Sequence, residues 1–212
     1  MEINCSPLET QLFKKVGTAA DKLGVPAYLI GGFVRDKIIG RPTTDVDVVC
    51  IGDGIELAHG VAALFSPRPT VAFFKTFGTA QIKIDDFIIE FVGARKESYA
   101  ADSRKPSVSP GTIEDDQNRR DFTINALAIG LHEGAFGQLV DPFGGLQAIQ
   151  DKIIKTPLAP HQTFSDDPLR MLRGIRFACQ LGYTIVPETL DAIADSAHRI
   201  SIISQERITE EL

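Results

Sequence analysis

The chain has 212 residues, enough for one large domain or for one domain and part of another. Apolar residues make up 43% of it, which is typical of a globular protein with a buried core. The formal net charge of −6 excludes a general attraction to nucleic acid, so any RNA contact needs a local basic patch or further segments of a longer protein. The cysteines, Cys5, Cys50 and Cys179, match neither a disulfide framework nor a zinc-binding spacing, which favours a reducing compartment.

The N-terminus carries mixed charges and has no apolar segment of the kind found in signal peptides. No apolar run approaches the roughly 20 residues that a membrane-spanning helix needs. Together with the cysteine usage, these features predict a cytoplasmic protein that has no membrane partner.

The first half of the chain mixes helical and extended patterns. Apolar residues at helical spacing predict a helix over residues 7–23, ended by Gly24. Strands are predicted at 27–30, 44–51, 71–74, 79–84 and 87–92, and further helices at 33–39 and 55–65. Because only Asp85 and Asp86 separate the last two strands, these should form an antiparallel hairpin.

The second half changes in character. Residues 95–118 are rich in Ser, Pro, Asp and Lys and predict a mobile loop. A helix is predicted at 119–130, a short strand at 137–141, a short helix at 146–151, an extended piece at 153–156, and helices at 167–181, 187–197 and 205–212. This shift to helices predicts a boundary near residue 145, with domains at 1–145 and 146–212. The last helical pattern has no stop signal, which predicts a fragment of a longer protein.

A double glycine and a pair of aspartates make residues 29–50 the most informative stretch. Successive strand side chains point to opposite faces, so Asp45 and Asp47 share one face, about 7 Å apart, and can bind divalent ions together. Gly31 and Gly32 let a phosphate approach the backbone, and the helix that follows offers free N–H groups. Each motif is common in turns and strand ends, but their order and short separation favour a phosphate and metal site.

Glu90 lies within an otherwise apolar predicted strand. Because a buried unpaired carboxylate is costly, it needs a partner there. It either faces water on an edge strand or stands beside Asp45 and Asp47 as a third ligand. Three carboxylates on neighbouring strands supply the hard oxygen ligands that suit Mg²⁺ and a two-metal site. Arg35 can reach a triphosphate, although it equally fits an exposed helix surface.

Two arginines, Arg119 and Arg120, precede Asp121 at the predicted start of a helix, where cations are disfavoured. An amphipathic helix explains the apolar residues of this block but leaves the arginines unexplained, whereas a bound triphosphate accounts for them. In the predicted helix, Asp121 and Asn125 lie one turn apart on the same face.

Asp167 precedes a proline, which is typical of a helix N-cap. The segment also suits base recognition, because cytosine and adenine both present an amino donor beside a ring-nitrogen acceptor. The Asp167 carboxylate can accept from the amino group while Arg170 donates to the ring nitrogen. Arg173 and Arg176 share a helix side with Arg170 and either contact nucleotide or RNA or cover the surface.

Six blocks in order resemble one family: GGFVRD, DVDVV, IEFVGARKE, RRDFTINALA, DPFGG and DDPLRMLRGIRFACQLG. The resemblance is to the nucleotidyltransferase superfamily, in the branch of class II CCA-adding enzymes (tRNA nucleotidyltransferases) and bacterial poly(A) polymerases. It implies an α/β fold, with a nucleotidyltransferase head built on a small mixed or antiparallel sheet and then an α-helical neck. The family usually has Glu where this chain has Asp166, a mild departure.

The resemblance also implies roles for individual residues. Asp45, Asp47 and Glu90 would be the catalytic residues and would hold Mg²⁺. The nucleotide would be bound by Gly31, Gly32, Arg35, Arg119, Arg120, Asp121, Asn125, Asp167, Arg170, Arg173 and Arg176.

The implied activity is template-independent addition of CMP and AMP, from CTP and ATP, to the 3′ end of tRNA by a two-metal mechanism. Poly(A) addition to other RNA 3′ ends is the alternative within the enzyme class. Outside the enzyme class, the presence of all three carboxylates argues against a nucleotide-binding module without turnover. The acidic net charge argues against a structural RNA-binding protein. Most RNA contacts are expected in regions beyond this chain.

Overall fold

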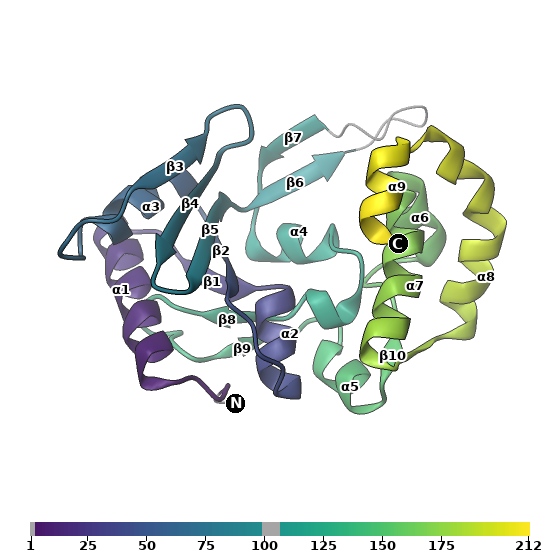
Figure 1. Ribbon diagram of the computed structural model, residues 1–212, viewed down its shortest axis with the longest axis horizontal. Helices are drawn as coiled ribbons and strands as arrows, with labels where there is room; N and C mark the ends of the chain where they lie inside the picture. Colours follow the sequence, from purple (N-terminus) through teal and green to yellow (C-terminus); the bar gives the residue numbers. More distant parts are fainter. Residues whose placement is uncertain (1–2, 99–106) are drawn as a thin grey trace.

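The computed structural model describes residues 3–98 and 107–212. Its centre is a seven-stranded sheet with the order β3-β4-β5-β2-β1-β8-β9 (Figure 1). Strands β2 and β5 run parallel and the other neighbours antiparallel, which confirms the predicted mixed sheet. The strands are β1 (Ala27–Ile30), β2 (Asp45–Cys50), β3 (Val71–Phe74), β4 (Thr79–Ile84), β5 (Phe87–Gly93), β8 (Ala128–Gly130) and β9 (Leu139–Val140).

Local signals set the first elements. Helix α1 (Pro7–Leu23) begins with a reciprocal capping box between Ser6 and Glu9 and ends at Gly24 in the left-handed conformation. Helices α2 (Gly32–Ile39) and α3 (Gly54–Ala62) follow, α3 being shorter than predicted. The predicted β4–β5 hairpin is confirmed.

One face of the sheet is buried under α1 and α3. The buried side chains of β2, β4 and β5 alternate with exposed ones, as a half-buried sheet requires. The opposite face carries a smaller apolar cluster at one end, which contains Ile30, Val49, Ala94 and Ala128. Elsewhere on that face Asp45, Asp47, Gln81 and Glu90 are exposed among the residues that the structure describes, and this part carries the candidate site.

The prediction of a mobile loop over 95–118 is wrong for the described residues. They form β6 (Arg95–Ser98), β7 (Ser107–Pro110) and α4 (Ile113–Asn118), while residues 99–106 lie outside the described part. Strands β6 and β7 pair antiparallel, and Thr112 with Asp115 forms a capping box at the start of α4. These polar residues are therefore structured by hydrogen bonds, which a reading of composition does not detect.

The helix predicted over 119–130 is also wrong. This segment contains the short 3-10 helix η1 (Thr123–Asn125) and strand β8, which pairs with β1 and β9. Every residue from 121 to 131 is buried. A segment surrounded by protein has no polar face, so its apolar spacing carries no reliable period.

The last third of the chain is mainly helical, as predicted. It contains α5 (Gly145–Gln150), β10 (Ile153–Ile154), α6 (Pro160–Asp166), α7 (Leu169–Leu181), β11 (Thr184–Ile185), α8 (Pro187–Ser196), η2 (Ala197–Ile202) and α9 (Gln205–Glu211). Helix α6 was not predicted; it has only seven residues. Helix α7 begins at Leu169 and not at Asp167, which is extended.

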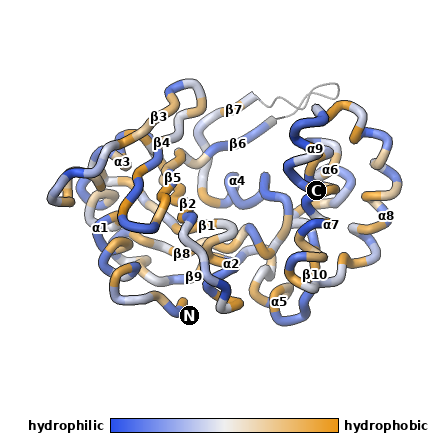
Figure 2. The backbone as a smooth tube through the Cα atoms, in the orientation of Figure 1, coloured by the Kyte–Doolittle hydropathy of each residue, from blue (hydrophilic) through white to orange (hydrophobic). Residues whose placement is uncertain are grey.

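The apolar core continues across the predicted boundary at residue 145. The rings of Phe122 and Phe177 pack edge to face with centroids 6.0 Å apart, and one buried cluster contains both. Figure 2 shows hydrophobic stretches on the central strands and a largely hydrophilic α9. Among the described helices, none has the length and apolar character needed to cross a bilayer. The division into 1–145 and 146–212 stays a proposal.

Candidate active site

The three predicted carboxylates lie on the face of the sheet opposite α1 and α3. Asp45 and Asp47 alternate with buried Val46 on β2, and Glu90 is the direct neighbour of Asp47 on the parallel strand β5. The Glu90 side chain reaches solvent, so the argument from the cost of a buried carboxylate was wrong in its premise. What brings Glu90 to the aspartates is strand register.

These carboxylates affect each other's titration. Burial raises the pKa of Asp47 above its ordinary value of 3.8, Arg120 opposes that rise, and Asp45 adds to it. Burial also raises the pKa of Glu90 above 4.5, and the charge of Asp47 raises it further. Like charges gathered on one face favour either a proton or a cation between them.

Whether these residues can bind a metal ion depends on their donor atoms and on how closely the side chains converge. Carboxylate oxygens are the hard ligands that Mg²⁺ prefers. Within residues 3–98 and 107–212, however, no three His, Cys, Asp or Glu side chains converge closely enough to form a ready metal-binding group. The register places Asp45, Asp47 and Glu90 on one face, and their side chains are not drawn together in this structure.

Gly31 shapes the wall next to these carboxylates. Its φ is +81°, and a Cβ there would lie 2.8 Å from Arg120 Nη1 and 3.2 Å from Asp47 Oδ2. Glycine therefore leaves space at the start of α2 for both the Arg120 guanidinium and the Asp47 carboxylate, which a side chain at this position would crowd. Gly32 follows, with Arg35 Nη2 3.6 Å from its Cβ position.

Arg119 and Arg120 are held by a buried aspartate that the sequence analysis missed. Asp116 accepts from Arg119 Nε at 2.9 Å through Oδ1 and from Arg120 Nη2 at 3.1 Å through Oδ2. Its side chain is fully buried, whereas both guanidinium groups remain partly exposed. Asp116 thus fixes two cations beside Asp47, and the Thr112–Asp115 capping pattern could have revealed its helix.

The prediction that Arg119 and Arg120 stand at the start of a helix is wrong. They follow the C-terminus of α4, where Arg119 is the C-cap, and do not begin a helix. Cations are favoured at that end of a helix, so the arginines need no ligand to explain them. Their role in triphosphate binding rests instead on their position beside the carboxylates: a cavity of about 200 Å³ is lined by Asp47, Glu90, Arg119 and Arg120.

A buried polar network connects the head to α7. Asn125 donates to Asp121 Oδ1 at 3.0 Å and accepts from Arg35 Nη1 at 2.6 Å. Arg173 donates from Nε to Asp121 Oδ2 at 2.7 Å. Burial by itself would raise the pKa of Asp121, but Arg173 and the Asn125 hydrogen bond hold it below its usual value. Asp121 and Asn125 meet as predicted, although η1 and not an α-helix brings them together.

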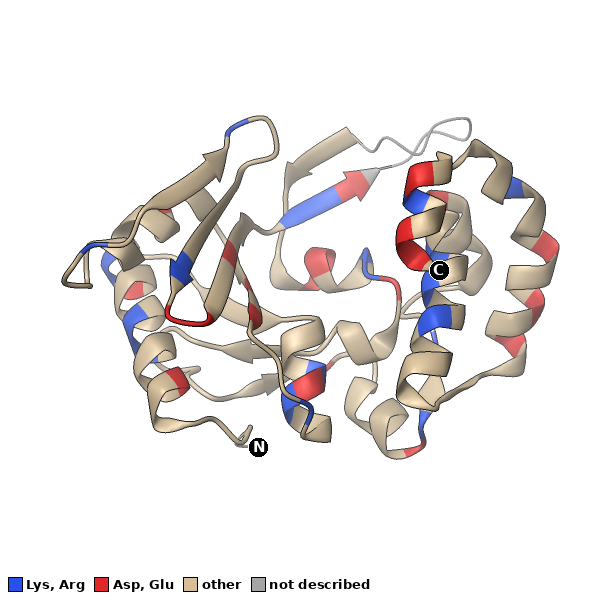
Figure 3. Cartoon of the chain, in the orientation of Figure 1, with Lys and Arg blue, Asp and Glu red and all other residues tan. Residues whose placement is uncertain are grey.

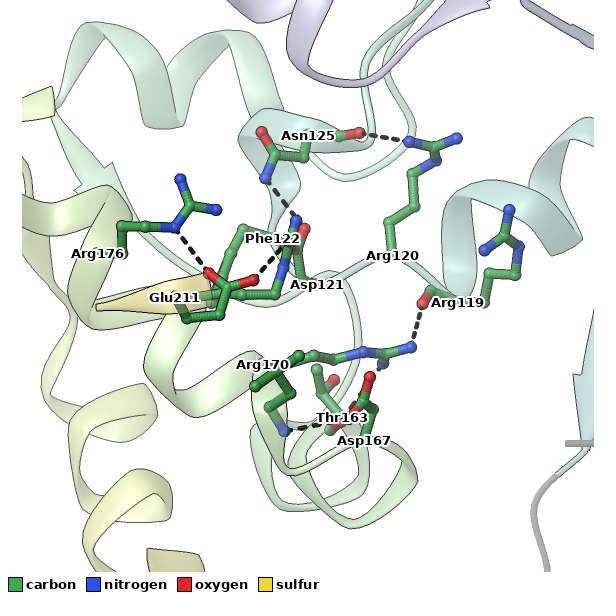
Figure 4. Close-up of polar contacts among 12 residues, drawn as sticks. Arg119, Arg120, Asp121, Phe122, Asn125, Thr163, Asp167, Arg170, Arg176 and Glu211 are labelled. Atoms are coloured by element: carbon green, nitrogen blue, oxygen red, sulfur yellow. Dashed lines mark hydrogen bonds and ion pairs between the residues drawn. The ribbon is translucent and has the colours of Figure 1, made fainter. Parts of the chain in front are cut away.

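The two predicted base-reading residues, Asp167 and Arg170, both have hydrogen-bond partners within the protein. Arg170 is buried and donates to the backbone carbonyls of Arg119 at 2.7 Å and Thr163 at 3.4 Å (Figure 4). Asp167 Oδ1 accepts at 3.1 Å from the N–H of Leu169, the first residue of α7, whereas the N-cap position itself is Pro168 and not Asp167 as predicted. Arg170 instead ties α7 to the segment that carries the two arginines.

Glu211 of α9 is a second residue that sequence reasoning missed. It accepts from Arg176 Nε at 2.7 Å and from Arg173 Nη1 at 3.3 Å (Figure 4). Three guanidinium groups, those of Arg35, Arg173 and Arg176, lie 4.4–5.2 Å from the centre of the Phe177 ring. No local pattern links Glu211 to arginines 35 and 38 positions away, so only the fold reveals it.

A mixed sheet with two carboxylates on one strand, a third on its parallel neighbour, and a double glycine at the start of a helix defines a nucleotidyltransferase head. The family model described as the poly A polymerase head domain matches residues 27–155. The chain belongs to this family. A second model, described as a probable RNA and SrmB-binding site of polymerase A, matches residues 182–212. Nucleotidyltransferases of this family generally use divalent metal ions.

Similar proteins agree with this assignment. An A-adding tRNA nucleotidyltransferase of Halalkalibacterium halodurans is 38% identical over 95% of this chain and 48% of its own length. The CCA-adding enzyme of Bacillus subtilis is 40% identical over 89% of this chain and 45% of its own. A tRNA nucleotidyltransferase solved with a primer tRNA and an incoming ATP analog superposes with a TM-score of 0.81 at 35% identity, covering 92% of this chain and 54% of the other. The chain spans about half the length of these relatives.

Proposed function

We propose that this chain is the catalytic head and neck of a template-independent RNA nucleotidyltransferase, which adds CMP and AMP from CTP and ATP to the 3′ end of tRNA. The observation that carries the proposal is the placement of Asp45, Asp47 and Glu90 on one face of the sheet, with Arg119 and Arg120 lining the same cavity as Asp47 and Glu90. Relatives named for CCA addition and for A addition, and a related structure containing a primer tRNA, support it.

Asp45, Asp47 and Glu90 would hold the divalent metal, for which Mg²⁺ is the best fit to their oxygen donors. When bound, the metal would lower the pKa of the RNA 3′-OH and neutralise charge on the phosphates. Gly31 adds no side chain of its own between Asp47 and Arg120.

The cations of the site are arranged for a triphosphate. Arg119 and Arg120 stay partly exposed while Asp116 fixes their direction, so they can bind phosphate oxygens without first becoming ordered. Arg35, Asp121 and Asn125 form the buried floor beside them, which suits contacts to the ribose. Phosphoryl transfer needs mainly such positioning and charge neutralisation.

Base selection by Asp167 and Arg170 is compatible with the observed contacts. The Arg170 guanidinium has five N–H donors, of which the carbonyls of Thr163 and Arg119 take one each, so others remain for a ring nitrogen. Arg173 and Arg176 lie on the same helix and are partly exposed. We therefore assign base reading to α7, with Arg170 and Asp167 as the reading pair and with Arg173 and Arg176 beside the nucleotide.

The alternative is addition of AMP alone. Several relatives are named A-adding enzymes, including one of Aquifex aeolicus that is 42% identical over 77% of this chain. Poly(A) addition to unrelated RNA belongs to the same alternative. Both use the same carboxylates and differ in which bases and which RNA ends are accepted.

Incorporation with Mg²⁺ separates these possibilities. The chain, together with any longer protein of which it is part, would be offered tRNA transcripts ending before CCA, tRNA ending after CC, and an unrelated oligonucleotide, with CTP and ATP separately and together. Ordered addition of C, C and A that then stops supports CCA addition, and addition of one A to the CC end alone supports the A-adding alternative. Long A tails identify poly(A) addition. Nucleotide binding without incorporation would contradict the enzyme assignment, and Asp47→Asn is the control for background activity.

A further inference from the structure

Exposed phenylalanines mark the turn between β3 and β4. Phe74 is 56% exposed and Phe77 is 72% exposed. Phe77 lies in the four-residue turn Lys75–Gly78, and the Phe77 N–H donates to Phe74 O at 3.0 Å. Neither ring covers the apolar core, so core packing does not explain why two large apolar side chains occupy this turn.

Strand register places Phe74 on the same face as the carboxylates. Directly paired residues share a face, and the row Phe74–Thr79–Val92 runs beside the row Gln81–Glu90–Asp47. With strands about 4.8 Å apart and residues about 3.4 Å apart along a strand, the Cα atoms of Phe74 and Glu90 are about 12 Å apart. Phe73 is paired with buried Ala80 and packs its ring against His59 of α3, on the opposite face.

A groove adjoins the candidate active site on the side of this turn. It has a volume of about 970 Å³ and lies between the β3–β4 turn and β7, with Lys75, Phe77 and Val108 among its lining residues. Val92 and Arg95 line both this groove and the smaller cavity that contains Asp47 and Glu90. The groove and the cavity are therefore neighbours that share part of their walls.

The chemistry of the groove suits unpaired bases more than a charged duplex. Its cations are Lys75 and Arg95, whose Nε lies 2.8 Å from Glu97. Figure 3 shows basic residues at the β3–β4 turn and on β6. Asp53, the acidic residue of the lining, is occupied in capping α3. With little net charge, the strongest interaction available is stacking on aromatic rings, the means by which single-stranded nucleic acid is bound without a sequence code.

We propose that Phe74, Lys75 and Phe77 bind the unpaired 3′-terminal nucleotides of the acceptor RNA, and this rests on the proposed function. Bases stack on Phe77 and Phe74, and Lys75 pairs with a backbone phosphate. The RNA then reaches Glu90 from the β4 side of the sheet, while Arg119, Arg120 and α7 bind the incoming nucleotide from the β1 side. The acceptor 3′-OH and the α-phosphate thus meet over the carboxylates from opposite directions.

The test uses Phe77→Leu, which keeps an apolar side chain but removes the stacking face, and Phe77→Trp, which keeps it. Phe73→Leu is the matched control, because Phe73 lies on β3 next to the turn and its side chain is on the opposite face of the sheet. NMR spectra of this chain are recorded during titration with a short oligoribonucleotide that ends in CC and has a free 3′-OH. The amide chemical shifts of residues 74–78 are followed. Steady-state incorporation then gives KM separately for the RNA acceptor and for ATP.

We expect the oligonucleotide to shift residues 74–78 at millimolar concentration, and Phe77→Leu to raise the acceptor KM about tenfold with an unchanged ATP KM. Phe77→Trp and Phe73→Leu should behave like the unmodified protein. Absence of shifts at the turn, or an acceptor KM unaffected by Phe77→Leu, would overturn the inference while leaving the nucleotidyltransferase assignment intact. Shifts at the turn in a protein that incorporates nothing would instead contradict the assignment alone.

Discussion

Replacing Asp116 by Asn tests how the arginine pair is positioned. Asp116 accepts four hydrogen bonds, two from Arg119 on Oδ1 and two from Arg120 on Oδ2. An asparagine keeps the shape but has one acceptor oxygen, and its NH₂ group would face the other guanidinium. Two charge-assisted hydrogen bonds are lost, each normally contributing about 1.5–3 kcal/mol when no water can substitute.

The expected cost is smaller than the sum of these bonds. Both guanidinium groups are partly exposed, so water satisfies some of the released donors, and we expect a loss of about 2 kcal/mol in the free energy of unfolding. With a urea dependence of about 2 kcal/mol per M, the unfolding midpoint would fall by about 1 M. Glu114→Gln is the matched control, because it removes one negative charge from an exposed position on the same helix.

ATP binding distinguishes positioning from simple charge. Removing a negative charge near the triphosphate would tighten ATP binding by Coulomb attraction alone. If Asp116 acts by orienting Arg119 and Arg120, Asp116→Asn weakens ATP binding, by about tenfold for the loss of one well-placed charged hydrogen bond. Calorimetric titration of ATP in the folded variant decides between them, and unchanged or tighter binding relative to Glu114→Gln would refute the reasoning.

Three further outcomes follow from the site. Gly31→Ala should lower stability by about 1–2 kcal/mol, because its positive φ is strained for alanine and the new Cβ meets Arg120. Gly40→Ala is the matched control, because Gly40 also has a positive φ but has open space around it. Gly31→Ala should reduce incorporation far more than Gly40→Ala, and an equal loss of incorporation in the two folded variants would contradict this. Arg170→Ala should let UTP and GTP compete in incorporation assays while metal dependence stays unchanged, and retained selectivity for C and A would exclude the base-reading role. Because the pKa values of Asp47 and Glu90 are raised in the folded state, the folded protein binds more protons than the unfolded chain just above pH 3.8 and 4.5. The free energy of unfolding of the metal-free protein should therefore fall as the pH rises through this window. Asp47→Asn should flatten this pH dependence in urea unfolding curves, and an unchanged slope would argue against the explanation.

The sequence by itself determined the elements whose signals are local. The cap residues Ser6 and Gly24 bound α1, and the two-residue alternation on β2 places Asp45 and Asp47 on one face. The short Asp85-Asp86 link produced the predicted β4–β5 hairpin. Each of these features depends on residues a few positions apart, so the local sequence is sufficient to predict it.

Only the tertiary structure determines the backbone conformation of the segment around Arg119 and Arg120. Gln117 donates to Ala126 O and Val140 O, and the N–H of Thr123 donates to Lys155 O, so hydrogen bonds to distant residues fix this backbone. Because the segment is buried on all sides, its sequence lacks the regular alternation of apolar and polar residues from which a helix or a strand is predicted. The result is a C-cap arginine pair fixed by Asp116 where the sequence predicts a loop followed by a helix.

The contacts that join the head to the helical segment also depend on the fold. Arg170 donates to a carbonyl 51 residues earlier in the chain, and Glu211 binds Arg176 from 35 residues away. The sequence could name Arg170 and Arg176 as functional candidates from their pattern on one helix. It could not show which of their donors are already occupied, because a hydrogen-bond partner is chosen by proximity in space and by burial.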